Sequence, residues 1–158
     1  MDPGWVRSPA EAGGKPRTRG DGPSIRTPGG SGISVDSRST PAAASTHVTV
    51  HRNQVTGTGI NGLHILGGVD LTLTDNRVNG AASYGFQISS SAEHVTVAGN
   101  RIFSTASAGI NVTNACHYVK AFGNVVRASG GGVVVPGTDN NGQPTNNSTT
   151  ADNQNIAA

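Results

Sequence analysis

The sequence is poor in the residues that build helical and disulfide-bonded proteins. Its 158 residues include one cysteine, four leucines and two lysines, and aromatic residues make up 4%. A single cysteine excludes an intrachain disulfide, so we interpret Cys116 as a small apolar residue in a turn. The scarcity of leucine and lysine, beside 23 glycines, disfavours a helical bundle.

Charged residues and long apolar runs are scarce as well. The formal net charge is +2, and six of the eleven Lys and Arg residues lie at or before Arg38. No basic stripe with interleaved aromatic residues is present, which argues against nucleic acid as a partner. No apolar run approaches the roughly 18 residues of a membrane span, and the first residues lack the pattern of a secretory signal peptide. We therefore expect neither a membrane span nor a nucleic-acid partner.

What the sequence does contain is a unit repeated four times. An asparagine recurs at spacings of 23, 24 and 24 residues, and a glycine at spacings of 23, 24 and 23. A period in the low twenties indicates a stacked-repeat architecture. The recurring residues are Asn53, Asn76, Asn100 and Asn124, and Gly62, Gly85, Gly109 and Gly132.

Each unit holds two strand-like phrases in which apolar residues alternate with polar or small ones, as in strands with one buried face. Five positions per unit are expected to point inward, and all 20 are apolar, whereas the chain's 34% hydrophobic usage would give about seven. The repeat is therefore predicted to be a β-coil. The inward positions are Val48, Val50, Val55, Leu63 and Ile65; Leu71, Leu73, Val78, Phe86 and Ile88; Val95, Val97, Ile102, Ile110 and Val112; and Val119, Ala121, Val126, Val133 and Val135.

The repeated asparagine marks a corner of each coil. Stacking at about 4.8 Å per coil would align the four asparagines in a ladder. Amide side chains in such a ladder hydrogen-bond to the next rung and to turn backbone. Alternatively, asparagine simply tolerates left-handed turn geometry. In either case we predict a structural role.

The N-x-[VI] and G-[ILF]-x-[VI] phrases resemble the parallel β-helix repeat of the pectate-lyase-like group, over residues 23–135. The resemblance implies a right-handed single-stranded parallel β-helix of about four to five coils, and the rule for parallel crossovers gives the same hand. Proteins of this architecture include polysaccharide lyases, uronan epimerases, tailspikes, adhesins and a periplasmic copper-processing protein. The resemblance thus implies an extracellular or cell-surface location and a polysaccharide partner.

A local resemblance concerns Tyr84, Gly85 and Phe86, which match the start of the Y-G-F-D-P-H catalytic segment of mannuronan epimerases. In this sequence Gln-Ile-Ser at 87–89 replaces the aspartate, proline and histidine. No catalytic residue of that segment therefore carries over.

Composition divides the chain into three parts. We interpret residues 1–22 as a disordered or loosely attached leader, 23–135 as the β-helix, and 136–158 as a polar low-complexity tail with too few apolar residues for another coil. Ile25 precedes Gly32 by the spacing found in the full coils, which predicts half a coil before the first. Because so short a stack is marginal alone, we expect a fragment of a longer β-helix or stabilisation in a homo-oligomer.

Columns of outward side chains are the places where a β-helix builds a site. Abstraction of a uronate proton requires a base, an acid and a positive group on the carboxylate. His94, Tyr118 and Lys120 supply those types, with Asp70 orienting a histidine and His47 binding substrate. The alternatives are an ordinary solvated sheet face and sugar binding without catalysis. The patch comprises two columns, His47, Asp70, His94 and Tyr118, and Thr49, Thr72, Thr96 and Lys120.

Two more columns are candidate substrate-binding surfaces. Arg77 and Arg101 are expected on neighbouring rungs, where they could grip a carboxylate or sulfate bidentately. Gln87 and Asn111 belong to an amide-rich column suited to sugar hydroxyls. Copper would require clusters of Met, Cys and His, whereas the sequence has five dispersed histidines, one cysteine and one methionine. We accordingly predict neither a metal site nor a cofactor.

Two hypotheses of function follow. The first is a carbohydrate-interacting β-helix module, which would be a polysaccharide lyase or uronan epimerase if it is an enzyme. The second is a non-catalytic structural solenoid, such as a surface adhesin or a tailspike-like shaft. Function must be argued from a site because this fold serves many activities.

Overall fold

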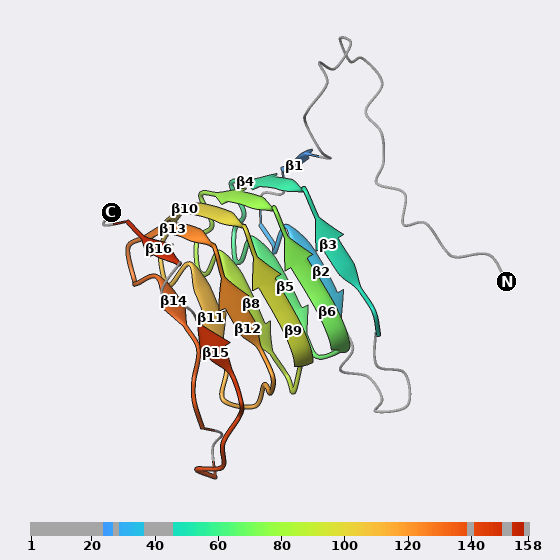
Figure 1. Ribbon diagram of the computed structural model, residues 1–158. Coiled ribbons are helices and arrows are strands. Elements are labelled where there is room, and N and C mark those ends of the chain that lie inside the picture. Colours follow the sequence, from blue (N-terminus) through green and yellow to red (C-terminus); the bar gives the residue numbers. More distant parts are fainter. Residues whose placement is uncertain (1–23, 27–28, 37–45, 139–140, 150–152, 157–158) are drawn as a thin grey trace, which may run out of the picture.

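The computed structural model describes residues 24–26, 29–36, 46–138, 141–149 and 153–156, which form strands and turns without a helix. Three parallel sheets run along one stack of coils (Figure 1). None of the described residues belongs to a helix long and apolar enough to cross a membrane. The architecture is a parallel β-solenoid of about four turns, which confirms the predicted fold class. The predicted leader at 1–22 lies outside the described residues.

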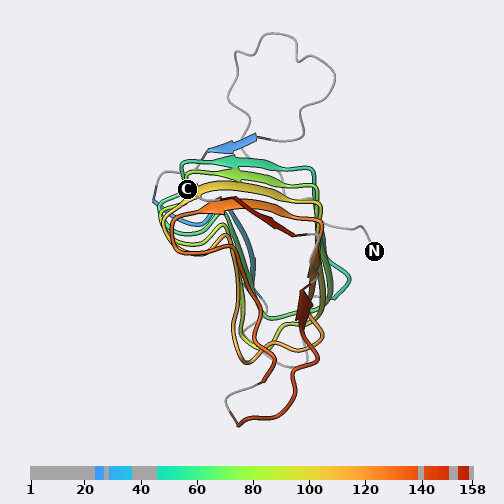
Figure 2. The ribbon, with the colours of Figure 1, turned by 60° about the vertical axis from the view of Figure 1, so that its left-hand side comes forward.

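Each sheet takes one strand from every coil, and Figure 2 shows the three sheets as three sides around a common interior. Sheet A has the order β1 (Ser24–Arg26), β4 (Gln54–Thr56), β7 (Arg77–Asn79), β10 (Arg101–Thr105), β13 (Val125–Ala128) and β16 (Gln154–Asn155). Sheet B has the order β14 (Val133–Val134), β11 (Ile110–Val112), β8 (Phe86–Ser89), β5 (Leu63–Leu66) and β2 (Ile33–Asp36). Sheet C has the order β15 (Ser148–Thr149), β12 (Lys120–Phe122), β9 (Glu93–Ala98), β6 (Val69–Thr74) and β3 (Thr49–His51).

The register between coils follows the sequence repeat. In sheet C, Val50 pairs with Leu73, Leu73 with Val97, and Val97 with Ala121. The half coil predicted before the first full coil is present, because Ile25 pairs with Val55 in sheet A. Equivalent residues of successive units therefore lie directly above one another, as the alignment of the repeats requires.

Each coil contains three strands where the sequence analysis described two strand-like phrases. The asparagine corner falls inside the first phrase and divides it, so that β3 ends before Asn53 and β4 begins after it. Immediately before this corner the chain takes a left-handed residue in each coil, with φ of 54° at Arg52, 54° at Asp75, 65° at Gly99 and 61° at Gly123. This bend directs sheets A and C toward different sides of the solenoid.

The interior consists of the predicted inward positions. All are buried except Val48, Val133 and Val135, which are partly buried and pack against the core from the end coils. The recurring glycine is explained by close approach between coils, since a Cβ on Gly109 would overlap the side chain of Val126. A larger residue there would force the coils apart.

The polar segment after Val135 differs from the expectation that it could not form another coil. β15 pairs with β12 and β16 pairs with β13, both in parallel. Strand pairing uses backbone groups, so it does not require apolar side chains. Asn147 and Asn153 supply the corner hydrogen bonds instead, from Asn147 Nδ2 to the Cys116 carbonyl (2.9 Å) and from Asn153 Nδ2 to the Ala121 carbonyl (2.8 Å).

Candidate functional site: a polar groove on sheet C

The entry to sheet C carries a column of left-handed residues that are not glycine. The backbone φ is 58° at His47, 57° at Asp70, 51° at His94 and 55° at Tyr118. An L-residue other than Gly, Asn or Asp is disfavoured in this conformation by roughly 1–2 kcal/mol. The bend recurs in every coil, and glycine would satisfy it best. Polar side chains occupy it instead, and Asp and His are among the non-glycine residues found most often in this conformation.

These four side chains contact one another along the stack. Asp70 lies between two imidazoles, with its Oδ2 3.5 Å from His47 Nε2 and its Oδ1 3.4 Å from His94 Nδ1. The His94 and Tyr118 rings are 4.9 Å apart at their centroids and inclined by 40°. The chain of contacts thus runs through all four coils.

A threonine column runs beside the first one. Thr49 pairs with Thr72, Thr72 with Thr96, and Thr96 with Lys120. Between the columns lies a groove with a volume of about 390 Å³, which we call the sheet C groove, lined by His47, Thr49, Asp70, Thr72, His94 and Thr96. Tyr118 and Lys120 continue the two columns, beyond the groove, into the next coil. The groove offers imidazole, carboxylate and hydroxyl groups to solvent.

Exposure decides what these groups can do. The side chains of His47, Asp70 and His94 are 79%, 46% and 52% exposed, and Tyr118 is 46% exposed. Ion pairs this open to water stabilise the fold little. A general acid or base is normally activated by burial and by exclusion of water, and this groove provides neither.

The predicted site residues fall on three sheets. His47, Asp70, His94, Tyr118 and Lys120 come together on sheet C. Arg77 and Arg101 are paired rungs of sheet A, and Gln87 and Asn111 are paired rungs of sheet B. The structure therefore gathers His47, Asp70 and His94 in one groove, with Tyr118 and Lys120 on the next coil beside it. It places the arginines and the amides on other sides of the solenoid.

The asparagine ladder is a structural element, as predicted. Asn76 Nδ2 donates to Asn100 Oδ1 (3.1 Å), and Asn100 Nδ2 donates to Asn124 Oδ1 (2.9 Å). The same oxygens accept backbone N–H groups of the preceding rung, at 2.9 Å from Asn76 N and 3.0 Å from Asn100 N. Asn76, Asn100 and Asn124 are fully buried. Their amides satisfy backbone groups that water does not reach.

Cys116 is enclosed in the interior, as a small residue of a turn. Its backbone N–H donates to the Thr113 carbonyl at 3.1 Å, and its side chain is fully buried. Burial raises the pKa of the thiol above its ordinary value of 9.0, and hydrogen bonds from Thr113 and nearby backbone oppose this only in part. The thiol is consequently a poor nucleophile and a poor metal ligand.

The described residues contain no group of three His, Cys, Asp or Glu side chains that could hold a metal ion. In the sheet C groove, each oxygen of Asp70 faces a different imidazole at ion-pair distance. This arrangement pairs the three groups with one another and leaves them no shared ligand position.

Sequence reasoning missed the left-handed columns. At the asparagine corner a signal exists, because Gly99 and Gly123 stand where earlier coils have Arg52 and Asp75. At the entry to sheet C there is none, since no coil has glycine at that position. Only the backbone angles identify His47, Asp70, His94 and Tyr118 as conformationally special.

Fold and groove together define a parallel β-helix protein with polar columns on its outer sides. Residues 27–158 match the family described as "Periplasmic copper-binding protein (NosD)". The match covers most of the chain, so the chain belongs to the NosD family. The match does not confirm the predicted resemblance to pectate-lyase-like proteins or to mannuronan epimerases. Comparison with curated proteins gives no match, and comparison with solved structures gives none either.

Proposed function

We propose that the chain is a carbohydrate-binding β-helix module that acts without catalysis, with the sheet C groove as its site. The observation that supports this is the unbroken row of side-chain contacts from His47 to Tyr118, two of them ion-pair contacts and one a ring contact. Carboxylate, imidazole and hydroxyl groups pair with sugar hydroxyls. An exposed tyrosine offers a flat apolar face to a sugar ring together with a polar tip.

The geometry favours an extended ligand. The row spans three coil steps, which is about 14 Å at the usual strand spacing. Such a length exceeds a single sugar and fits an oligosaccharide lying along the stack. His94, Tyr118, Lys120 and Asp70, which the sequence analysis assigned to catalysis, are assigned here to binding because they are open to water.

The family description suggests copper as a second ligand, but the described donor set does not fit it. Copper sites in proteins use clusters of Met and Cys for Cu(I), or of His with oxygen ligands for Cu(II), and in the part of the chain that the structure describes no group of three His, Cys, Asp or Glu could hold a metal ion. Here Cys116 is buried in the core and the groove histidines contact Asp70. We therefore assign no copper chemistry to these residues. The word "periplasmic" in the same description agrees with a location outside the cytoplasm.

A structural solenoid is the alternative, and the ends of the stack favour it. In the described part of the chain, β14, β15 and β16 each have a neighbour on one side only. Open parallel edges of this kind accept further coils or another chain. A longer β-helix or a homo-oligomer would cover them.

Calorimetric titration with neutral and acidic oligosaccharides tests the carbohydrate proposal. Replacing Tyr118 with Ala should weaken the best ligand about tenfold, and Asp70→Asn about fivefold, because each removes one direct contact. The matched control is Asp75→Asn, since Asp75 is also left-handed and also contacts a histidine, with Oδ2 3.6 Å from His51 Nδ1.

Three results would overturn the proposal. The first is that no oligosaccharide binds saturably, and the second is that wild type and Tyr118→Ala bind with equal affinity. The third is that Asp75→Asn loses as much affinity as Asp70→Asn. Release of unsaturated uronate product would instead establish a lyase. Absence of binding together with defined oligomers in light scattering would support the structural solenoid.

A further inference from the structure

The outer side of sheet A is a basic surface. Its strands contribute four arginines and neither aspartate nor glutamate. No ion pair joins these arginines to a carboxylate within the part of the chain that the structure describes. Arg77 and Arg101 are register partners in neighbouring coils, where two like charges repel one another and an anion would relieve the repulsion. The arginines are Arg26, Arg77, Arg101 and Arg127.

Two of these arginines differ in their surroundings. The guanidinium of Arg77 lies 5.8 Å from the centroid of the Phe103 ring. Arg127 is the register partner of Phe103 in the next coil. In the described structure no ring contact or ion pair engages Arg127. Its five N–H donors therefore remain open to a ligand.

A backbone irregularity lies beside Arg127. The register between β10 and β13 shifts between Phe103 and Thr105, so that Ser104 is an extra, bulged residue with φ of 55°. In the two preceding coils the corresponding position is Gly57 or Gly80, with φ of 65° and 77°. Serine is disfavoured at such an angle, whereas glycine is not. The exchange places a hydroxyl group where the backbone alone would take glycine.

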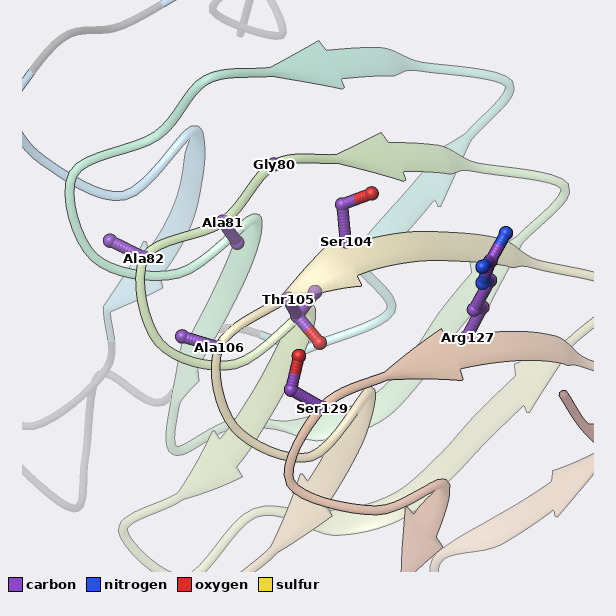
Figure 3. Close-up of a pocket in the computed structure, with 8 residues that line it drawn as sticks. All are labelled: Gly80, Ala81, Ala82, Ser104, Thr105, Ala106, Arg127 and Ser129. Carbon is purple, nitrogen blue, oxygen red and sulfur yellow. The ribbon is translucent and has the colours of Figure 1, made fainter. Parts of the chain in front are cut away.

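A cavity of about 500 Å³ joins these features. It is lined by the polar side chains of Ser104, Thr105, Arg127 and Ser129, and otherwise by glycine and alanine. Figure 3 shows the polar side chains, which come from β10, from β13 and from the residue after β13. The Thr105 hydroxyl donates to the Ser107 carbonyl at 3.0 Å, so its oxygen is fixed in place. The small residues keep the cavity open around the charged and hydroxyl groups.

From this geometry we infer that the cavity binds an oxyanion group, such as the sulfate, phosphate or carboxylate of a ligand. The Arg127 guanidinium fork and the hydroxyl groups of Ser104 and Ser129 match the tetrahedral or planar oxygens of such groups. The lining includes no carboxylate that would repel an anion. This site lies on sheet A, apart from the sheet C groove, and does not depend on the carbohydrate proposal.

Titration of the whole chain with sodium sulfate and sodium phosphate, at ionic strength held constant with sodium chloride, tests the inference. Amide chemical shifts of Ser104 and Ser129 should move saturably. Arg127→Gln should weaken binding about tenfold, because it removes a charge-assisted contact. The matched control Arg52→Gln, an exposed arginine at the asparagine corner, should leave the affinity unchanged.

The variant Ser104→Gly separates ligand binding from folding. It restores the glycine of the two preceding coils, so the fold and the Tm should be retained or improved. Binding should nevertheless weaken about threefold, since a neutral hydroxyl contact is lost. Unchanged affinity in Ser104→Gly or Arg127→Gln would overturn the site, as would an equal loss in Arg52→Gln.

Dextran sulfate and uncharged dextran distinguish a free ion from a group carried on a polymer. If inorganic sulfate binds with the expected dependence on Arg127, the site is an oxyanion site for either source. If only dextran sulfate binds, and Arg127→Gln weakens it, the site recognises the group on a chain. Dextran sulfate binding that is identical in wild type and Arg127→Gln would refute the inference.

Discussion

Replacing Asn100 with alanine tests the asparagine ladder at its centre. The side chain makes four hydrogen bonds, all in the interior. Its Oδ1 accepts from the Asn76 backbone N–H (2.9 Å) and from Asn76 Nδ2 (3.1 Å). Its Nδ2 donates to the Leu73 carbonyl (2.8 Å) and to Asn124 Oδ1 (2.9 Å). Water cannot replace these contacts, because both neighbouring asparagines are fully buried.

The magnitude follows from the groups that lose partners. Truncation leaves the Asn76 backbone N–H and the Leu73 carbonyl without their Asn100 partners. Each unsatisfied buried group costs roughly 1–3 kcal/mol. We expect the free energy of unfolding to fall by about 3–5 kcal/mol. The same change at Asn53 should cost only about 1 kcal/mol. Asn53 is partly buried and donates to Asn76 Oδ1 (3.0 Å) and to the exposed His51 carbonyl (3.2 Å).

Urea unfolding followed by far-UV circular dichroism measures both variants against wild type. The comparison assumes two-state unfolding, which equal slopes with denaturant would verify. Equal losses in Asn100→Ala and Asn53→Ala would refute the reasoning, because burial of the rung would then have no effect. A loss below about 1 kcal/mol in Asn100→Ala would do so as well.

Two further predictions concern single residues. Gly109→Ala should destabilise the fold by about 1–3 kcal/mol, because its Cβ would overlap Val126. The control Gly137→Ala has open space around its Cβ and should change the Tm little. Equal losses of stability in the two variants would contradict the argument from close approach. Cys116 in the folded chain should resist thiol reagents until the protein unfolds, since it is buried with a raised pKa. Because the folded pKa is the higher one, the stability linked to the neutral thiol is complete below about pH 9 and is lost as pH rises through the folded pKa. Cys116→Ala should remove that pH dependence. Fast labelling of Cys116 in the native wild type would contradict the predicted resistance to thiol reagents.

The register and the core could be predicted from the sequence because the repeat states them four times. A one-residue shift would turn every inward side chain to solvent, so four concordant units leave one register. The ladder followed from the same alignment. The coil after Val135 could not be predicted this way, because its strands are held by backbone pairing and by Asn147 and Asn153. The amino-acid composition of a segment does not reveal such contacts.

The candidate site was less accessible to sequence analysis. The column of His47, Asp70, His94 and Tyr118 followed from the repeat, but its left-handed backbone did not. The third strand of each coil was not recognised either, although the buried positions shift by one residue at the corner, from Leu71 and Leu73 to Asn76 and Val78. That corner places the column of Arg77 and Arg101 on sheet A and the groove on sheet C, so these candidate binding residues face different directions.

In a repeat protein, the residues that depart from the repeat carry information that the repeat cannot. Positions where all coils agree are explained by packing, as with Gly109 against Val126. A departure that costs conformational energy needs another explanation, and Ser104 is such a case, since two earlier coils show that glycine satisfies the same bend. The strained residue also lines the cavity beside an arginine without an ion pair in the described chain. Strain and unpaired charge are independent observations, and both lead to sheet A as a second binding surface.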